Sequence, residues 1–515
     1  MSAFLLRIQR WFAQRPWLLA GLGVALLMLL VTSPAWARVG GGESFSSGGG
    51  GSSGGSDSDA DLIFFLLWLC IEHPAIGVPL TLIVIVVAIV KKASGPKKQE
   101  WTAGAPSSEQ YVAPVQRGAR RQLERIREQD PEFSTVLFED FLYALYAAAH
   151  EARGGGQLAT LSAYFAAAAR ARFHPRSPGM PRLTQVKDVV VGSMRVTQVL
   201  GLEPASPAVR VTVRFETNFT ELVEASGGGK PGENPIWAIE VWHLSRKRGL
   251  VSRPPERASK IGCPSCGAAL TEVRGNTCSY CQQVVDTGAF DWRVDGIDLV
   301  GRVARPPAVS LGGEVESGTD LPTLTAPDAL PNLQTLEARD PALTLDAFRA
   351  RAEMVFRELQ AAWSAREWLR VRPYVSDSLF QMQLYWIEGF KRQGLRNVID
   401  QVQVQRLEVA SVVCDAHYDA ITVRIFASCL DFVQSEDGKL VRGSKSRPTR
   451  FSEYWTFIRG SGRTGAPSAE KKCPNCGAPQ QINQAGSCEY CHAKITSGEF
   501  DWILSRIEQD DVYAG

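Results

Sequence analysis

The chain repeats itself at a spacing of 210 residues, and this repeat restricts the possible folds more than any other feature. Two long copies of one unit do not form a solenoid of short stacked repeats, so each copy should fold around its own core. Trp242 and Trp455 lie 213 residues apart, which indicates a small loop insertion that is compensated further along the chain. The pairs at the 210-residue spacing are Asp130-Pro131 with Asp340-Pro341, Thr212–Phe215 with Thr422–Ile425, Cys263-Pro-x-Cys-Gly with Cys473-Pro-x-Cys-Gly, and Phe290-Asp291-Trp292 with Phe500-Asp501-Trp502.

Each copy is predicted to contain helices followed by strands. After each Asp-Pro pair, apolar residues recur at helical spacing, and a second helix is expected near residues 157–172 and 376–393. Asp130 and Asp340 are interpreted as N-caps, with Pro131 and Pro341 in the first helical turn. The fold class is therefore α+β, with helices packed on an antiparallel sheet. Alternation of apolar and polar residues predicts the strands near 186–200, 209–216 and 236–245 in copy one, and near 398–414, 421–425 and 451–459 in copy two.

Eight of the eleven cysteines form two groups with the same spacing, C-x2-C-x11-C-x2-C. Two tight turns that each supply two thiolates complete a tetrahedron around zinc, and Gly267 and Gly477 stand where the backbone must bend. Disulfides and redox pairs are the alternatives, and the cytoplasmic location argued below and the lack of a β-α-β pattern count against them. We predict two structural zinc ions in two zinc ribbons, because four thiolates leave no position open, and we interpret His492 as a bystander. The predicted ligands are Cys263, Cys266, Cys278 and Cys281, and Cys473, Cys476, Cys488 and Cys491.

The N-terminus is predicted to carry targeting information. Residues 1–37 have a basic start, an apolar stretch and the cleavage pattern Ala35-Trp36-Ala37, which are typical of a signal peptide. An uncleaved first transmembrane helix is the alternative. Residues 38–61 are rich in glycine and serine and are expected to form a disordered tail.

A second apolar run, at 62–90, is predicted to enter the membrane. Glu72-His73-Pro74 interrupts it, so we expect an interfacial segment at 62–71 and a spanning helix from about Pro74 to Val90, with one long tilted helix as the alternative. The positive-inside rule then predicts a single-pass protein of the inner cell membrane, with the tail outside and the C-terminal domains in the cytoplasm. The lipid bilayer is therefore one predicted partner. The positive charges that follow the run are Lys91, Lys92, Lys97 and Lys98.

The remaining boundaries follow from composition and from the repeat. We predict a linker at 91–115, copy one at 116–250, ribbon one at 258–295, and a second linker at 296–338. Copy two is expected at 339–460, ribbon two at 470–505, and a tail at 506–515.

Enzymatic activity is not expected. A duplicated active site would need its base in both copies, and none of the six histidines has a histidine 210–213 residues away. The sequence contains no G-x-S-x-G, Walker A or H-E-x-x-H pattern. Cys414 and Cys429 are interpreted as packed thiols. The histidines are His73, His150, His174, His243, His417 and His492.

Nucleic acid is an unlikely partner for the chain as a whole, because its formal net charge is only +2. Basic residues do precede each ribbon, and we interpret them as solvated linkers, with contact to nucleic acid or to the membrane surface as the alternatives. They are Arg246, Lys247, Arg248, Arg253, Arg257 and Lys260 before ribbon one, and Lys471 and Lys472 before ribbon two.

Several motifs resemble those of the Tim44-like domain family, which includes the anchor of the import motor at the mitochondrial inner membrane and membrane-anchored bacterial members. The resemblance covers about 116–250 and 339–460, and copy one departs from the pattern around Trp242. It implies a fold akin to nuclear transport factor two, membrane association, an apolar pocket for lipid tails, and a role in protein transport or membrane assembly. The motifs are Asp130–Ser134 in copy one, and Asp340-Pro341, Trp363–Glu367, Pro373–Asp377, Tyr418–Arg424 and Phe451–Phe457 in copy two.

These expectations together favour a membrane-anchored scaffold that recruits a protein partner through its tandem domains. Binding of a lipid or small hydrophobic ligand in the domain pocket is one alternative, and nucleic-acid contact through the ribbons is a second.

Overall fold

A computed structural model describes residues 44–46, 100–102, 118–175, 179–225, 232–255, 261–274, 276–304, 318–467, 472–483, 486–510, 513 and 515. The predicted signal peptide, the apolar run at 62–90 and most of the first linker lie outside these residues. Within the described ranges, no helix is long and apolar enough to cross a membrane.

One short sheet lies in segments for which we predicted no structure. Strand β1 (Ser44–Ser46), in the predicted disordered tail, pairs antiparallel with β2 (Glu100–Thr102), in the predicted linker. The expectation that both segments lack regular structure is therefore wrong for these six residues, because extended backbone from one segment satisfies the hydrogen bonds of the other.

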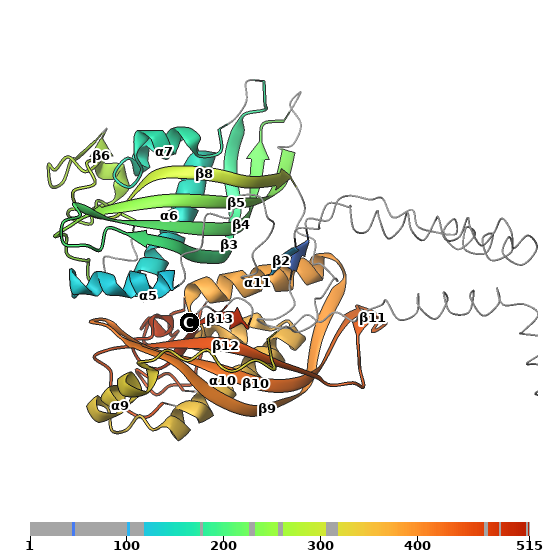
Figure 1. Ribbon diagram of the computed structural model, residues 1–515. Coiled ribbons are helices and arrows are strands. Elements are labelled where there is room, and N and C mark those ends of the chain that lie inside the picture. The colour runs from blue at the N-terminus through green and yellow to red at the C-terminus, as the bar shows by residue number, and fades with distance from the viewer. Residues whose placement is uncertain are drawn as a thin grey trace, which may run out of the picture. The chain divides into compact units, whose positions relative to one another are not determined.

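Copy one is a four-stranded antiparallel sheet with helices packed against it, in the strand order β3-β4-β5-β8 (Figure 1). Alternating apolar residues point into the core from β4, where Val211, Val213 and Phe215 are buried. The second predicted helix is shorter than expected and is split by a turn. The elements are α5 (Ala119–Glu124), η1 (Arg125–Glu128), α6 (Thr135–Gly154), η2 (Leu158–Leu161), α7 (Ala167–Arg172), β3 (Leu183–Leu200), β4 (Ala208–Val223), β5 (Gly232–Lys247) and β8 (Arg293–Ala304).

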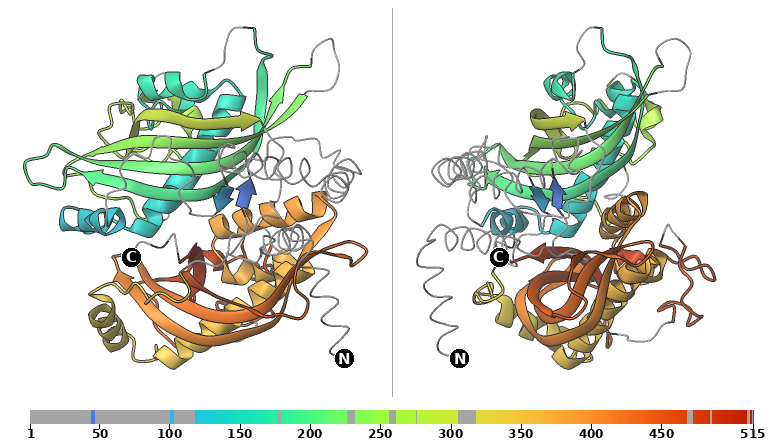
Figure 2. Two further views of the ribbon diagram at one scale, coloured as in Figure 1. Left: turned by 45° about the vertical axis from the view of Figure 1, so that its right-hand side comes forward. Right: turned by 90° about the vertical axis from the view of Figure 1, so that its right-hand side faces the viewer.

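Copy two repeats this topology with β9, β10, β12 and β13 in place of β3, β4, β5 and β8, and its sheet curves strongly around the helices (Figure 2). A hairpin strand, β11, pairs with β10, and the insertion that shifts the repeat from 210 to 213 residues lies between β11 and β12. There, the step from Cys429 to Phe432 on β10 faces the longer step from Thr449 to Gly443. The elements are α9 (Ala329–Arg339), α10 (Leu345–Ala365), η4 (Trp368–Tyr374), α11 (Asp377–Arg392), β9 (Leu395–Cys414), β10 (Tyr418–Ser435), β11 (Leu440–Gly443), β12 (Thr449–Gly460) and β13 (Ile503–Gln509).

The two copies agree in strand register as well as in element order. Trp242 on β5 lies opposite Val213 and Ile297, and Trp455 on β12 lies opposite the equivalent Val423 and Ile507. The mixed α+β class with antiparallel sheets is thus confirmed.

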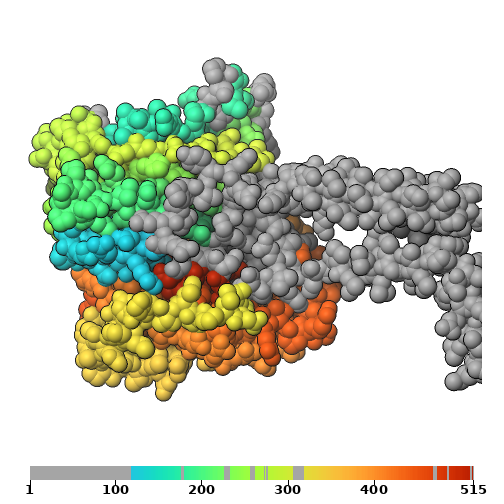
Figure 3. Space-filling view, viewed as in Figure 1, coloured from blue at the N-terminus to red at the C-terminus, as the bar shows by residue number. Residues whose placement is uncertain are grey.

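Each ribbon interrupts its sheet instead of following it. Ribbon one, with η3 (Leu270–Glu272), β6 (Val273–Arg274) and β7 (Thr277–Cys278), lies between β5 and β8; ribbon two, with η5 (Ile495–Ser497), lies between β12 and β13. The assignment of 296–338 to a linker is therefore wrong for 296–304, and that of 506–515 to a tail is wrong for 506–509, because these residues form edge strands. The linker assignment is also wrong for 329–338, which belong to helix α9. In Figure 3, ribbon one is exposed at the surface (yellow-green).

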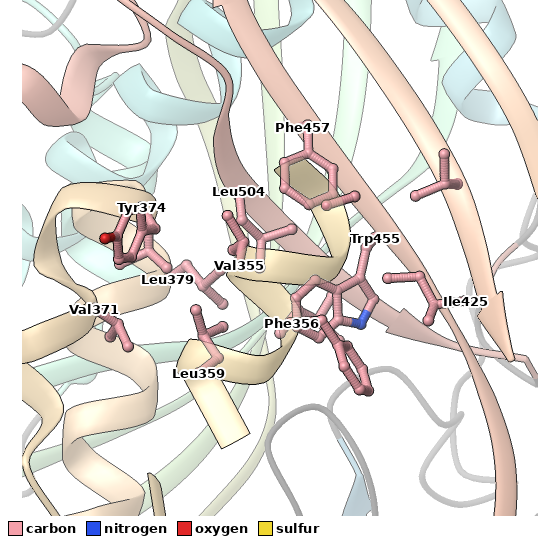
Figure 4. Packing of buried hydrophobic residues seen from close by; sticks show 14 of the residues in the cluster. Val355, Phe356, Leu359, Val371, Tyr374, Leu379, Ile425, Trp455, Phe457 and Leu504 are labelled. Carbon is pink, nitrogen blue, oxygen red and sulfur yellow. The ribbon is translucent and has the colours of Figure 1, made fainter. Parts of the chain in front are cut away.

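The core of copy two lies between α10 and the sheet. Figure 4 shows Val355, Phe356 and Leu359 of α10 pointing towards Trp455 and Leu504 of the sheet. The rings of Phe356 and Trp455 lie 4.9 Å apart, within the range of favourable aromatic pairs. Leu504 comes from β13, so the strand that follows the ribbon contributes to the domain core.

The predicted N-caps are wrong. The side chain of Ser134 accepts the hydrogen bond at the start of α6, and Thr344 does the same for α10. Asp130 and Asp340 instead lie buried, four residues upstream of these caps, where each pairs with an arginine.

Candidate metal centres

The four cysteines of each group meet as predicted. Their sulfur atoms all lie within 4.8 Å of one another, and all eight cysteines are free thiols. Four sulfurs at about 2.3 Å from a tetrahedral zinc ion would lie about 3.8 Å apart. The observed separations match this value: 3.8 Å for Cys263–Cys281, 3.9 Å for Cys266–Cys278, 3.8 Å for Cys473–Cys491 and 4.0 Å for Cys476–Cys488.

Each pair of cysteines lies on a tight turn that the backbone closes. In ribbon one, the amide of Gly267 donates to the carbonyl of Cys263 at 2.8 Å, and the amide of Gln282 donates to that of Cys278 at 2.9 Å. Gly267 and Gln282 both have positive φ, 83° and 59°, as the turn requires. In ribbon two His492 occupies the position of Gln282, with φ 60°, and it is not among the four converging ligands.

The cysteines of one site differ in how easily they ionise. Burial raises the pKa of Cys263 and of Cys473 to about 12. Hydrogen bonds from backbone amides lower the pKa of Cys281 to about 7 and that of Cys491 to about 6, and Asn475 adds a side-chain contact at 3.4 Å to the latter. Because metals bind the thiolate, Cys281 and Cys491 should ionise first, and the charge of the ion would then stabilise the buried thiolates.

One tyrosine ties each ribbon to its own domain. The hydroxyl of Tyr164 donates to the carbonyl of Gly262 at 2.6 Å, and the equivalent Tyr374 donates to Gln480 at 2.9 Å. These bonds fix the first pair of cysteines against the segment that follows the long helix of each copy.

A buried cluster of one aspartate, one arginine and one tryptophan holds the chain in place where it leaves each ribbon and re-enters the sheet. In copy two, Asp340 pairs with Arg459 at 2.9 Å, and the guanidinium lies 4.7 Å from the ring centre of Trp502. In copy one, the same arrangement joins Asp130, Arg246 and Trp292, at 2.8 Å and 5.8 Å. The repeated Asp-Pro and Phe-Asp-Trp motifs therefore meet in space.

This cluster changes the interpretation of the basic residues before ribbon one. Arg246 is 5% exposed, and Arg253 forms an ion pair with Asp291. The guanidinium of Arg248 donates to backbone carbonyls, including that of Ser206 at 2.7 Å. At least three of the six basic residues are thus engaged within the domain instead of forming a solvated linker.

Copy two also has a surface groove of ≈ 340 Å³ between η4 and α11. Its apolar wall includes Trp368, Phe380 and Ile387. At its rim, Arg370 pairs with Glu367 at 3.0 Å and Lys391 pairs with Glu388 at 2.7 Å. Such a mixture of apolar and charged side chains suits an amphipathic partner.

Sequence reasoning missed a buried carboxylate that occupies the equivalent position in the two sheets. Glu240 and Glu453 are both 0% exposed, and each accepts a hydrogen bond from the tryptophan two residues later, at 2.8 Å and 2.9 Å. The pattern Glu-x-Trp occurs at both positions, so the pairing with Trp242 and Trp455 could have been found by extending the repeat to the 213-residue spacing.

The fold and the cysteine sites define a repeat protein of two α+β domains. In each domain, a ribbon with four cysteines that could hold a metal ion is inserted before the edge strand. Residues 332–468 match the Tim44-like domain family, so copy two is a Tim44-like domain. This match links the chain to protein transport or membrane association. No curated protein matches the chain.

Proposed function

We propose that the protein is a membrane-anchored scaffold that presents two α+β domains in the cytoplasm to partner proteins, in protein transport or membrane assembly. The observation that carries this proposal is the Tim44-like domain at 332–468. The apolar run at 62–90 and the lysines that follow it support an anchor in the inner membrane with the domains on the cytoplasmic side.

The proposed scaffold uses zinc for structure and has no catalytic role. Four thiolates fill a tetrahedral zinc shell, so neither ribbon would leave a position for water or substrate. Copy one has the same sheet topology and would give the scaffold a second domain with its own surface.

The groove on copy two is where we place the protein partner. Leu369 lines this groove and is 51% exposed, so a probe at this position can reach a partner seated in the groove. Its neighbour Arg370 is paired with Glu367 at 3.0 Å.

A photo-crosslinking amino acid at position 369 of the full chain, activated in intact cells, tests the scaffold proposal. We expect a reproducible protein adduct that co-sediments with membranes. Leu440 on β11 of the same copy, 44% exposed, is the matched control and should give no such adduct. Absence of any adduct specific to position 369, or recovery of the chain in the soluble fraction, would contradict the proposal.

Binding of an anionic lipid is a second candidate, favoured by the apolar wall and the basic side chains at the rim of the same groove. It predicts a lipid adduct at position 369 in place of a protein adduct. Native mass spectrometry of the detergent-solubilised chain would then show a bound lipid that is lost when Lys391 is replaced by glutamate.

A further inference from the structure

The core of copy one holds a group of ionisable side chains that the ribbons and the groove do not use. His150 on α6, His174 after α7 and Glu240 on β5 are 0%, 5% and 0% exposed. One ligand atom from each lies within 4.8 Å of the others. The Nε2 atoms of His174 and His150 lie 2.7 Å and 3.2 Å from the same oxygen, Oε1 of Glu240.

Neighbouring groups hold the carboxylate in a fixed orientation. The indole of Trp242 donates to Oε2 of Glu240 at 2.8 Å, and the hydroxyl of Tyr146 donates to Oε1 at 2.5 Å. That hydroxyl also lies 2.7 Å from Oγ1 of Thr217. Outer hydrogen bonds of this kind orient the first ligands of protein metal sites.

The backbone at His174 is held in an uncommon conformation. Its φ is 46°, in the left-handed region that residues other than glycine rarely adopt. Its Nδ1 atom is buried without a hydrogen-bond partner among the described residues. Strained backbone of this kind persists where the surroundings impose it, and it clusters at functional sites.

We propose that His150, His174 and Glu240 form a third metal site, which binds a divalent first-row transition metal such as zinc or iron(II). Two imidazoles and one carboxylate are a ligand set typical of these ions. Ligand atoms at about 2.0–2.2 Å from one ion lie about 3 Å or more from each other, so the present separations require only a small expansion. The ion would join α6, the segment after α7 and the central strand β5.

Arg153 contacts one of the proposed ligands, and metal binding must displace this contact. Its Nη2 lies 3.3 Å from Nδ1 of His150, while its Nη1 is bonded to Glu221 at 2.8 Å. When Nε2 of His150 binds an ion, the ring proton must sit on Nδ1, so the longer contact is lost and the pair with Glu221 stays. The third site should therefore release its metal to a chelator before the ribbons do.

Copy two shares the carboxylate and the indole of this site but lacks both histidines. Gln360 stands 210 residues after His150, and Leu384 stands 210 residues after His174. The carboxylate and its indole remain, since Trp455 donates to Glu453 at 2.9 Å. The proposed site belongs to copy one alone.

Metal content of the full chain, purified in detergent without chelators and offered zinc or iron(II) anaerobically, tests the proposal. We expect three ions per chain for the wild type and two for the variants His150→Ala and His174→Ala. The variant His243→Ala is the control, because this histidine lies in the same copy but its side chain is 44% exposed, and it should keep three ions.

X-ray absorption of the zinc-loaded wild type gives a second reading that does not depend on how a variant folds. The proposed site adds nitrogen and oxygen neighbours to the sulfur shell of the two ribbons. A sulfur-only shell with two ions per chain, or a third ion retained in both histidine variants, would overturn the proposal.

Discussion

Replacement of Asp340 by alanine separates two interpretations of the repeated Asp-Pro motif. As an N-cap, this aspartate would contribute about 1 kcal/mol to stability. If the aspartate is instead a buried ion-pair partner, its removal leaves Arg459 without an opposite charge. Arg459 is 2% exposed, so the expected loss is about 3–5 kcal/mol.

The atoms in contact with the carboxylate support the larger value. Its oxygens accept hydrogen bonds from Arg459 at 2.9 Å and from the amide of Gly465 at 3.0 Å and 3.1 Å. The variant loses all of these bonds, although the guanidinium keeps its bond to the carbonyl of Gly465 at 3.0 Å. A buried donor left without an acceptor costs about 1–3 kcal/mol, which is consistent with the total.

Hydrogen exchange of the full chain, read on peptides from α9, α10 and β12 as a function of urea, measures the opening free energy of copy two without assuming that the whole chain unfolds in one step. The control is Asp346→Ala, in the same copy, whose side chain is 95% exposed and 3.7 Å from Arg349; its loss should be at most about 1 kcal/mol. An equally small loss for Asp340→Ala would refute the buried-pair reasoning. The double variant Asp340→Leu with Arg459→Met should recover part of the stability, because it leaves no unpaired charge.

Three further outcomes are expected. Cys488→Ser should lower the metal content by one ion and speed hydrogen exchange in β13. Unchanged exchange in β13 would show that metal binding in the ribbon does not stabilise the sheet. Tyr374→Phe should cost about 1 kcal/mol in copy two and loosen ribbon two, as seen by faster metal release; equal release rates would contradict the anchoring role. Burial alone would raise the pKa of Glu221, but Arg153 and Arg302 lower it to about 2, below its ordinary value of 4.5. Its stabilising effect should thus be complete above about pH 4.5 and lost as the pH falls towards 2, and Glu221→Gln should abolish this part of the acid sensitivity of copy one, whereas an unchanged acid profile would refute it.

The repeat and the residue periodicity were sufficient to predict the fold class, because both depend on local patterns. Alternation along β4 and β10 placed Val213 and Val423 on the buried face, and the structure confirms both positions. The cysteine spacing was equally informative, since two C-x-x-C turns at one fixed separation bring four sulfurs together in each ribbon.

What could not be predicted depends on contacts between residues far apart in the chain. The role of Asp340 is set by Arg459, and no local pattern distinguishes that role from an N-cap. His150 and His174 likewise converge only because α6 and the segment after α7 lie over the same strand, so a search for paired histidines in the two copies discarded them.

The position of the ribbons explains why their motifs were repeated together with the domains. Residues 461–502 form a long connection between β12 and β13, and the cost of closing a loop rises with its length, by about 0.6 kcal/mol per doubling. A metal ion that joins Cys473 to Cys491 shortens the free part of this connection. A single parallel bridge also joins Leu504 of β13 to Val375, between η4 and α11, where the amide of Ser376 donates to the carbonyl of Leu504 at 2.9 Å. Loss of metal should therefore destabilise this edge of the sheet first. The same argument applies in copy one, where the amide of Ala166 donates to the carbonyl of Val294 at 2.9 Å.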